Sequence, residues 1–507
     1  MRMLGREALG VRREVIDASG GMKSAERLIA GLLMSALLLM AAALHAPMVL
    51  AEGPPADDPR HMRFPTVEFN PPEPERLVLE NGMVVYLLED HELPLITLNT
   101  MIRSGTWLDP DDKIGLAAMT SAVMRIGGSA RMSADEIDDE LERMAATISI
   151  SFGKESGSAS LDVLKKDFPR GLQILADLLR RPAFEPSRME LARLQALEGI
   201  RRRQDNPGSV AAREFAKLLY GPAHPSAREA TVESVRRITR DDLVAFHRGT
   251  VQPNGIILGV SGDFDKPTLL AQLREVFGDW PKGPVPVLSI PDVPPAEAAM
   301  PAVRFINKDT SQTHVRMGHL SIKETDPDYV ALAIANDILG GGSFRSRLFN
   351  DVRTKRGLAY SVGSAFRAGT HDQGVWYMRA ETKLPSTQEV VNRFVANIER
   401  LRQEPVSDAE LEEAKEAYVN SFVFSFTSAA SIVNRFMDLE YDGLPKDWLQ
   451  QIRARVVKLT KDDILRAAQK HLHPDRLRLL AVGSGETLQK VLASFGEVKE
   501  IKLAPEG

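Results

Sequence analysis

Residues 238–243 read Ile-Thr-Arg-Asp-Asp-Leu, and residues 459–464 read Leu-Thr-Lys-Asp-Asp-Ile, an offset of 221 positions. The same offset places Pro253 on Pro474 without a gap. Both copies put a threonine where its side chain can cap a helix, with acidic residues in the first turn, and then pass through a proline into an apolar strand. The chain is therefore expected to contain an internal duplication.

Two further pairs of signals support this duplication. A helix that ends in Ile-Gly-Gly at residues 126–128 matches one that ends in Leu-Gly-Gly at residues 339–341. Ser187 and Ser407 each precede a glutamate by three positions, the spacing of a capping box that opens a long helix. The two copies are thus expected to align over most of their length.

A proline-rich segment, residues 283–301, separates the copies and is typical of an extended spacer. We expect one domain at residues 67–282 and a second at residues 302–500, because 507 residues exceed what a single core usually holds. The first half mixes helices and strands, including a hairpin at residues 76–89 with an Asn-Gly turn and an amphipathic helix at residues 169–179. This mixture favours the α+β fold class.

The N-terminus has the pattern of a secretory signal. An apolar run at residues 28–44 follows two basic residues, and a small-residue site suited to cleavage ends at Ala51. Residues 1–51 are therefore expected to be a signal peptide, with Met22 as a possible true start, followed by an exposed segment at residues 52–66. An uncleaved membrane anchor is the alternative, since about 17 apolar residues are marginal for a bilayer core of ~30 Å. Export to the periplasm is the expected localisation.

Charge and composition exclude several classes of function. With 64 basic and 69 acidic residues dispersed along the chain, the formal net charge is -5, and nothing indicates a nucleic-acid surface. The absence of cysteine excludes disulfides and thiol chemistry. The ten histidines lack the spacing of a metal site, and isolated surface or capping histidines are the better interpretation.

Residues 115–122 read Gly-Leu-Ala-Ala-Met-Thr-Ser-Ala. The frame resembles the zinc helix of the insulinase/pitrilysin family of metallopeptidases, whose H-x-x-E-H motif supplies two zinc-binding histidines and a glutamate that activates water. In this chain Ala118, Ser121 and Ala122 occupy those three positions. By the same resemblance, the family's third ligand, a glutamate, falls on Gly199.

A catalytic zinc needs three protein ligands with nitrogen, oxygen or sulfur donors. Two alanines and a glycine supply none, and Glu198 lies one position away from the ligand register, about 100° around a helix. The metal site is therefore expected to be degenerate. We expect no metal, no cofactor and no catalysis by this chain alone.

The second half reads Gly-Gly-Gly-Ser-Phe-Arg-Ser-Arg-Leu-Phe at residues 340–349 and Val-Arg-Thr-Lys-Arg-Gly-Leu-Ala-Tyr-Ser-Val at residues 352–362. This is similar to the family's arginine/tyrosine motif. The resemblance implies that Arg353 and Tyr360 bind a peptide substrate, the phenol near the scissile carbonyl and the guanidinium near carbonyls beyond it. Both groups can donate hydrogen bonds to a peptide backbone. The plainer alternative is a cation at a helix end and an aromatic residue in a strand.

The glycine triplet at residues 340–342 follows an expected helix and lacks the lysine of a phosphate loop, so a helix stop is the better interpretation. The family resemblance implies two homologous α/β-roll domains that face each other like a clamshell. In several members of that family one subunit carries H-x-x-E-H and another completes the peptide site. The sequence thus predicts a non-catalytic, substrate-positioning subunit, acting on peptides or unfolded segments, whose homologous partner carries the zinc.

Two alternatives from other classes remain. The chain could be a structural scaffold, in which Arg353 and Tyr360 have no role, or a binding protein that captures extended peptides by strand addition at a sheet edge. Retention of both residues favours the subunit over the scaffold.

Overall fold

A computed structural model describes residues 71–291, 293, 302–342 and 344–504. Residues Val67–Gly507 form one compact unit. The expected signal peptide and the segment at 52–66 lie outside the described residues, as does most of the C-terminal half of the proline-rich segment. Its described part, residues 283–291, forms neither helix nor strand. No helix of the described residues is long and apolar enough to cross a membrane.

The first half contains a six-stranded sheet in the order β1-β2-β6-β3-β5-β4. The expected Asn-Gly hairpin is confirmed: β1 and β2 are antiparallel, and the Gly82 amide donates to the Leu79 carbonyl at 2.8 Å. β2 runs parallel to β6, whereas the other neighbours are antiparallel. The strands are β1 (Glu75–Val78), β2 (Val84–Glu89), β3 (Leu95–Ile102), β4 (Thr147–Phe152), β5 (Gly157–Leu164) and β6 (Ile256–Gly262).

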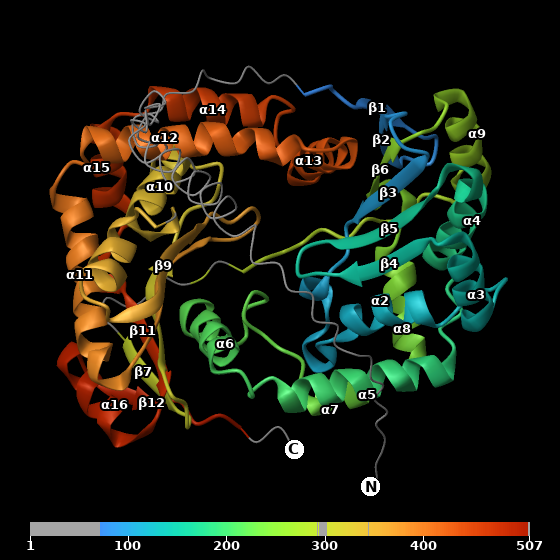
Figure 1. The fold of residues 1–507 in the computed structure, drawn as a ribbon. Helices are drawn as coiled ribbons and strands as arrows, with labels where there is room; N and C mark the ends of the chain where they lie inside the picture. Colours follow the sequence, from blue (N-terminus) through green and yellow to red (C-terminus); the bar gives the residue numbers. More distant parts are fainter. Residues whose placement is uncertain (1–70, 292, 294–301, 343, 505–507) are drawn as a thin grey trace, which may run out of the picture. The chain divides into compact units, whose positions relative to one another are not determined.

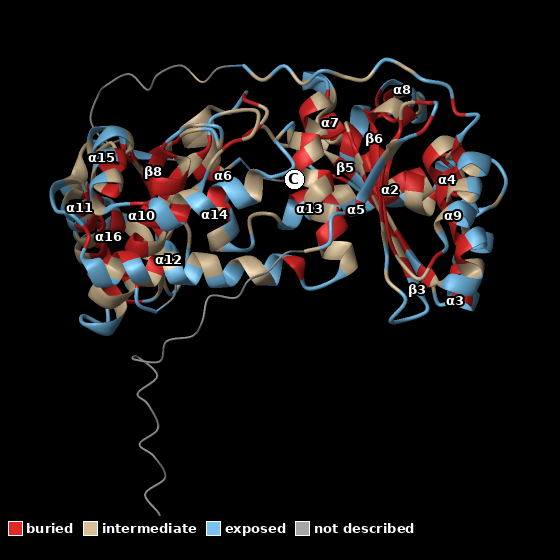
Figure 2. Ribbon diagram, turned by 90° about the horizontal axis from the view of Figure 1, so that it is seen from above, coloured by how far each residue is buried: buried red, intermediate tan, exposed pale blue. Residues whose placement is uncertain are grey.

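Eight α-helices accompany this sheet in the described part of the first half. The expected helix at 169–179 is confirmed as α4, and its apolar residues lie in the main core of this half, as does Leu98 of β3. The helices are α2 (Leu116–Ile126), α3 (Ala134–Met144), α4 (Phe168–Arg180), α5 (Pro186–Arg202), α6 (Pro207–Tyr220), α7 (Val232–Arg237), α8 (Arg240–Thr250) and α9 (Lys266–Phe277). Figure 2 shows exposed residues, in pale blue, on the outer sides of α3, α4 and α9.

The second half has a sheet in the order β12-β7-β11-β8-β10-β9. Its strands are β7 (Ala302–Asn307), β8 (Thr313–Leu320), β9 (Ala359–Arg367), β10 (Val375–Thr382), β11 (Arg478–Gly483) and β12 (Val498–Glu500). Its helices are α10 (Tyr329–Asn336), α11 (Thr387–Gln403), α12 (Asp408–Phe422), α13 (Ala429–Asp442), α14 (Trp448–Lys458), α15 (Lys461–His471) and α16 (Gly485–Leu492), with two π-helical turns, η5 (Asp337–Gly341) and η6 (Phe349–Thr354). The fold is therefore mixed α and β.

The two sheets repeat one topology, which confirms the internal duplication. The order β2-β6-β3-β5-β4 recurs as β7-β11-β8-β10-β9. Thr239 and Thr460 both form capping boxes at the starts of α8 and α15, as expected from the repeated segment. Only the outermost strand differs, since β1 is antiparallel to β2 whereas β12 is parallel to β7.

One expected cap is confirmed and one is wrong. Ser407 caps α12 in a capping box. At α5, however, the N-cap is Glu185, whose carboxylate accepts hydrogen bonds from the amides of Ser187 and Arg188 at 3.1 and 3.0 Å. Pro186 occupies the first helical position, which lacks a donor in any case, so the residue before the proline takes the capping role.

Each half also contributes a helix to the other half's sheet. α13 contacts β2, β3 and β6, and α6 contacts β8 and β11 (Figure 1). Val433 and Met437 of α13 pack so closely on β6 that a Cβ on Gly259 would lie 2.4 Å from each of them. The absence of a side chain at Gly259 thus permits this contact.

Candidate functional site

The helix that resembles a zinc helix is present, and it contacts α5. Ala118 is exposed and Ala122 half-buried, and neither side chain can bind a metal. Ser121 is buried, and its hydroxyl donates to the carbonyl of Ala118 at 3.0 Å. The hydroxyl that replaces the family's glutamate is therefore occupied by its own helix.

The position that the resemblance gives to the third ligand, Gly199, lies at the surface with free space around it. Gly199 is exposed on α5, and a Cβ built there meets no atom within 4 Å. Glu198 is also exposed, and its nearest ion-pair partner is Arg201 at 3.8 Å, a geometry that contributes little at a surface.

The N-terminus of α2 keeps hydrogen bonds to a carboxylate, although this helix lacks the histidines and glutamate of a zinc helix. The Asp109 carboxylate accepts hydrogen bonds from the amides of Gly115 and Ala117 at 2.7 and 2.8 Å. Burial raises the pKa of Asp109 to about 6, and those two amides and Arg228 oppose the increase. The Asp109 side chain thus satisfies two amides at the start of the helix.

The interpretation of the histidines as surface or capping residues is wrong for three of them. His224, His247 and His319 are buried. His247 Nε2 lies 2.8 Å from the Leu179 carbonyl, and His319 Nδ1 lies 2.7 Å from the Leu320 carbonyl. Burial lowers the pKa of His319 to about 4. These are core histidines whose ring nitrogens bind backbone, which single-sequence spacing does not reveal.

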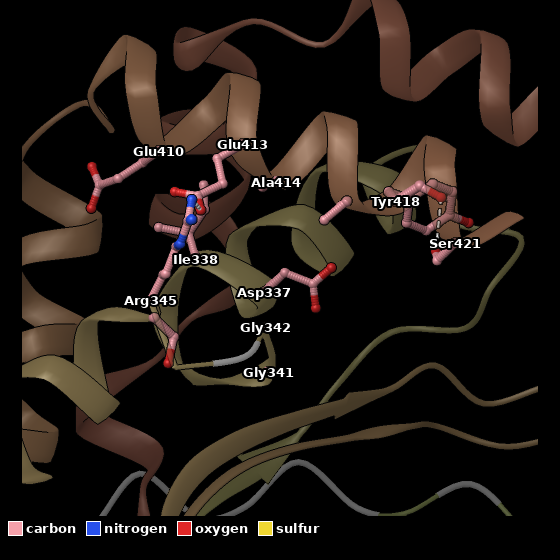
Figure 3. A pocket seen from close by; sticks show the side chains of 12 residues that line it. Asp337, Ile338, Gly341, Gly342, Arg345, Glu410, Glu413, Ala414, Tyr418 and Ser421 are labelled. Atoms are coloured by element: carbon pink, nitrogen blue, oxygen red, sulfur yellow. Dashed lines mark hydrogen bonds and ion pairs between the residues drawn. The ribbon is translucent and has the colours of Figure 1, made fainter. Parts of the chain in front are cut away.

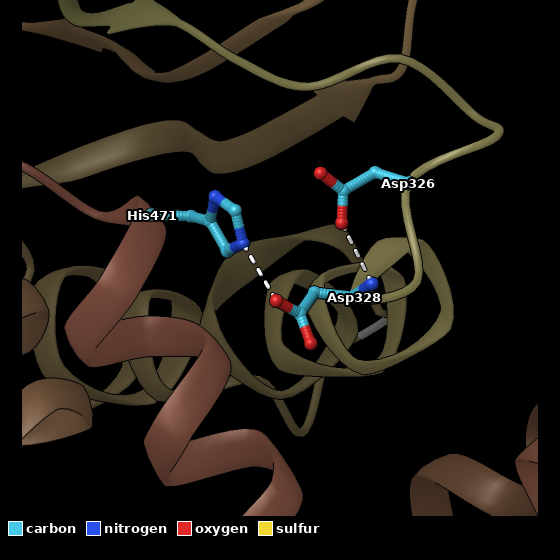
Figure 4. A group of neighbouring side chains, drawn as sticks. All are labelled: Asp326, Asp328 and His471. Carbon is cyan, nitrogen blue, oxygen red and sulfur yellow. Dashed lines mark hydrogen bonds and ion pairs between the residues drawn. The ribbon is translucent and has the colours of Figure 1, made fainter.

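Asp326, Asp328 and His471 form a compact group of potential metal ligands, with ligand atoms within 4.8 Å of one another (Figure 4). The Asp328 carboxylate already binds His471 Nε2 and the ammonium of Lys470, each at 2.8 Å. Asp326 accepts the Asp328 amide at 2.8 Å. A cation would have to displace Lys470, so we interpret the group as an ion-paired start of α10.

Tyr360 lies at a β-bulge near the start of the edge strand β9. Glu381 of β10 pairs with Ser361 and Thr382 pairs with Ala359, so Tyr360 is the extra, unpaired residue between them. A bulge redirects a side chain relative to the regular alternation of a strand. Tyr360 is 77% exposed, and its hydroxyl has no hydrogen-bond partner among the described residues.

Arg353 lies in the last turn of η6, as expected for a cation at a helix end. Its guanidinium lies over two aromatic rings, with Cζ 4.3 Å from the centre of the Tyr360 ring and 4.6 Å from the centre of the Phe349 ring. In the described part of the chain, the guanidinium makes no hydrogen bond or ion pair. Its N–H groups are therefore available to another hydrogen-bond acceptor.

Phe349 was not identified from the sequence as part of this site. It precedes Arg353 by four positions in the π-helical turn, and its ring also makes an edge contact with exposed Phe344 at 4.9 Å. The signal that could have identified it is an aromatic residue one helical turn before the arginine.

The glycine triplet is a helix stop, as expected. The Gly342 amide donates to the Asp337 carbonyl at 2.9 Å, which closes the π-helical turn η5. A Cβ on Gly340 would lie 2.6 Å from the amide nitrogen of Ser364 in β9. The triplet therefore lets this helix end pack on the strand that carries Tyr360.

A pocket of about 380 Å³ opens between η5 and α12 (Figure 3). Asp337 and Tyr418 are among the residues that line it. Burial raises the pKa of Asp337 to about 6 and that of Tyr418 to about 12. No local sequence pattern indicates this pocket, because it forms only where two helices distant in the chain meet.

The repeated topology of two mixed α and β halves, with a helix that resembles a zinc helix but carries Ala118, Ser121 and Ala122, indicates a relative of the metallopeptidases. Comparison with known families agrees. Residues 84–221 match the family model "Insulinase (Peptidase family M16)", and residues 237–418 match "Peptidase M16 inactive domain". The chain belongs to the insulinase family, peptidase M16.

The relatives include proteins named zinc proteases and one named a non-peptidase homolog. An uncharacterized zinc protease of Streptomyces coelicolor is 26% identical over 347 residues, covering 68% of this chain and 75% of that protein. The non-peptidase homolog YmxG of Helicobacter pylori is 24% identical over 384 residues, covering 74% of this chain and 86% of that protein. The crystal structure of a peptidase M16 inactive domain from Pseudomonas fluorescens has a TM-score of 0.72 and 27% identity, covering 81% of this chain and 98% of that one. The chain is thus similar to non-catalytic relatives of the family.

Proposed function

We propose that this chain is the non-catalytic, substrate-positioning subunit of a heteromeric insulinase-family zinc peptidase. Its partner is a homologous subunit with an intact H-x-x-E-H motif, and the zinc belongs to that partner. Its substrates are peptides or unfolded segments. The two halves of the chain, in this proposal, face each other like a clamshell, and the exported protein works in the periplasm.

The observation that carries this proposal is the arrangement of Arg353 and Tyr360. Tyr360 lies at the bulge and is 77% exposed, and the guanidinium of Arg353 contacts the Tyr360 and Phe349 rings without any described hydrogen bond or ion pair. A preorganised phenol and guanidinium can bind successive carbonyl oxygens of an extended peptide without reading its side chains. A scaffold has no need for such exposed, unengaged donors.

Ala118, Ser121, Ala122 and Gly199 support the non-catalytic part of the proposal, since none offers a free ligand in the family's zinc positions. Oxyanion stabilisation by the Tyr360 phenol would act on a carbonyl that the partner's zinc polarises. The test is peptidase activity of the H-x-x-E-H partner with and without this chain. A partner that is equally active alone would overturn the proposal.

One observation favours a second candidate, a peptide-binding protein without a proteolytic role. Among the described strands, β4 and β9 end their sheets, and each pairs with a single neighbour, β5 and β10 respectively. An extended peptide can add to such an edge through backbone hydrogen bonds. Binding of an unfolded peptide without cleavage, in the presence of every H-x-x-E-H homologue of the host, would favour this candidate.

A further inference from the structure

A second pocket, of about 390 Å³, lies beside η6, and half of its ten lining residues are cationic. The segment around η6 provides three of them and α11 provides two. They are Arg345, Arg347, Lys355, Arg393 and Arg400. The pocket belongs to the second half alone, and neither Arg353 nor Tyr360 lines it.

The two carboxylates that line the pocket are already engaged. Glu410 accepts hydrogen bonds from Nε and Nη2 of Arg347 at 2.7 and 2.9 Å and from the Ser407 amide at 2.9 Å. The hydrogen bonds from Arg347 hold the pKa of Glu410 at about 2, against an opposing effect of burial. Asp351 accepts the amide of Asn397 at 2.9 Å and is paired with Arg356. Three further cations of the lining pair with glutamates outside it: Arg345 with Glu413, Arg393 with Glu389 and Arg400 with Glu404.

Arg347 provides a buried hydrogen-bond donor in the lining of this pocket. Its side chain is only 5% exposed, and its third nitrogen, Nη1, is buried with no hydrogen-bond partner among the described residues. A buried donor without a partner is costly, so such groups in native proteins usually bind a water or a ligand. Lys355 is exposed beside it and has no ion pair in the described part of the chain.

We propose that this pocket binds the phosphate group of a small phosphorylated molecule. Arginine matches the oxygen geometry of phosphate and stays charged in a buried position, and a lysine at the rim adds a mobile point charge. Four of the five cationic residues already pair with a carboxylate, so the donors left for a ligand are Nη1 of Arg347 and the ammonium of Lys355. A buried guanidinium N–H together with an ammonium fits an oxyanion such as phosphate. The volume leaves room for more than the phosphate itself.

The test measures binding of inorganic phosphate and of pyrophosphate to the full chain by isothermal titration calorimetry at constant ionic strength. Acetate serves as the carboxylate probe. Lys355→Ala removes an exposed group without a described partner and should keep the fold, whereas loss of Arg347 would leave Glu410 unpaired and could unfold the protein. Lys490→Ala, at an exposed lysine of α16 without a described ion pair, is the matched control.

We expect saturable binding of both phosphate probes, weakened by about fivefold in Lys355→Ala and unchanged in Lys490→Ala. Pyrophosphate binding more tightly than inorganic phosphate would identify a larger phosphorylated ligand, and equal affinity would identify free phosphate. No saturable binding, equal affinity in all variants, or acetate binding as tightly as phosphate would overturn the proposal. Because the chain is tested without a partner subunit, this result is independent of the proposed peptidase role.

Discussion

The guanidinium carbon of Arg353 lies 4.3 Å from the centre of the Tyr360 ring. Seven residues separate the two in the sequence, and the contact joins the last turn of η6 to the bulge of β9. The two groups therefore form one unit, in which the ring contacts the guanidinium and neither side chain has a described hydrogen-bond partner. A change in the orientation of one should alter the other.

Phe349→Leu should weaken peptide processing by the reconstituted complex although Phe349 need not touch the substrate. The guanidinium carbon of Arg353 lies 4.6 Å from the centre of the Phe349 ring, and a cation–π contact of this kind is worth about 0.5–2 kcal/mol. We expect kcat/KM to fall by about threefold to tenfold. Phe344→Leu is the matched control, because Phe344 contacts Phe349 but has no described contact with Arg353. Equal losses in both variants would contradict a positioning role.

Restoring the ligands should create a zinc site. The triple variant Ala118→His, Ala122→His and Gly199→Glu places ligands on two helices that already contact each other, and the Gly199 position has free space for a side chain. Elemental analysis after dialysis should find about one zinc per chain in this variant and far less in the natural chain and in Ala118→His alone. A tightly bound zinc in the natural chain, lost on mutation near residues 118–122, would contradict the degenerate site.

Asp337→Asn should stabilise the protein at high pH only. Burial raises the pKa of Asp337 to about 6, above the value of about 3.9 in an unfolded chain. Between these values the native state binds more protons than the unfolded state, so the contribution of Asp337 to stability is lost as pH rises through about 6. Urea unfolding should show a gain of about 2 kcal/mol or less at pH 8 and almost none near pH 4.

The matched control for that measurement is Asp139→Asn, at an exposed residue of α3 without a described partner. It should change the free energy of unfolding by less than about 0.5 kcal/mol at either pH. An Asp337→Asn effect of the same size at pH 4 and pH 8 would show that the carboxyl group has no raised pKa.

Fractionation of the native host should place the mature protein outside the cytoplasm, with an N-terminus near Glu52. The reason is the small-residue cleavage site that ends at Ala51. N-terminal sequencing of the purified material measures this directly. A protein that keeps Met1 or Met22 and sediments with membranes would support the uncleaved anchor.

Much of the fold could be predicted from local signals. Thr239 and Thr460 cap their helices as the repeated segment indicates, because a capping box depends on residues three positions apart. The cap of α5 could not be assigned in this way, since Glu185 and Ser187 both had suitable side chains and only Pro186 decided between them. His319 was misassigned because burial depends on strands that meet only in the folded chain.

The candidate site, too, could be predicted only in part from the sequence. Arg353 and Tyr360 were identified by the motif, but the bulge that exposes Tyr360 follows from the register between β9 and β10, which pairing alone determines. The cationic pocket with buried Arg347 likewise combines η6 with α11 and the start of α12. Tertiary contacts of this kind leave no periodic signal in a single sequence.

The central claim is that Arg353 and Tyr360 complete the active site of a zinc-bearing partner. Its most direct test is steady-state kinetics of the reconstituted pair with Tyr360→Phe and Arg353→Ala, with co-purification to show that the complex stays intact. Tyr360→Phe should lower kcat and kcat/KM together by about 10-fold to 100-fold, because a phenol aimed at a developing oxyanion acts in the transition state. Arg353→Ala should also raise KM, since the guanidinium binds ground-state carbonyls. If both variants match the natural chain in an intact complex, the pair has no catalytic role and the scaffold function is correct.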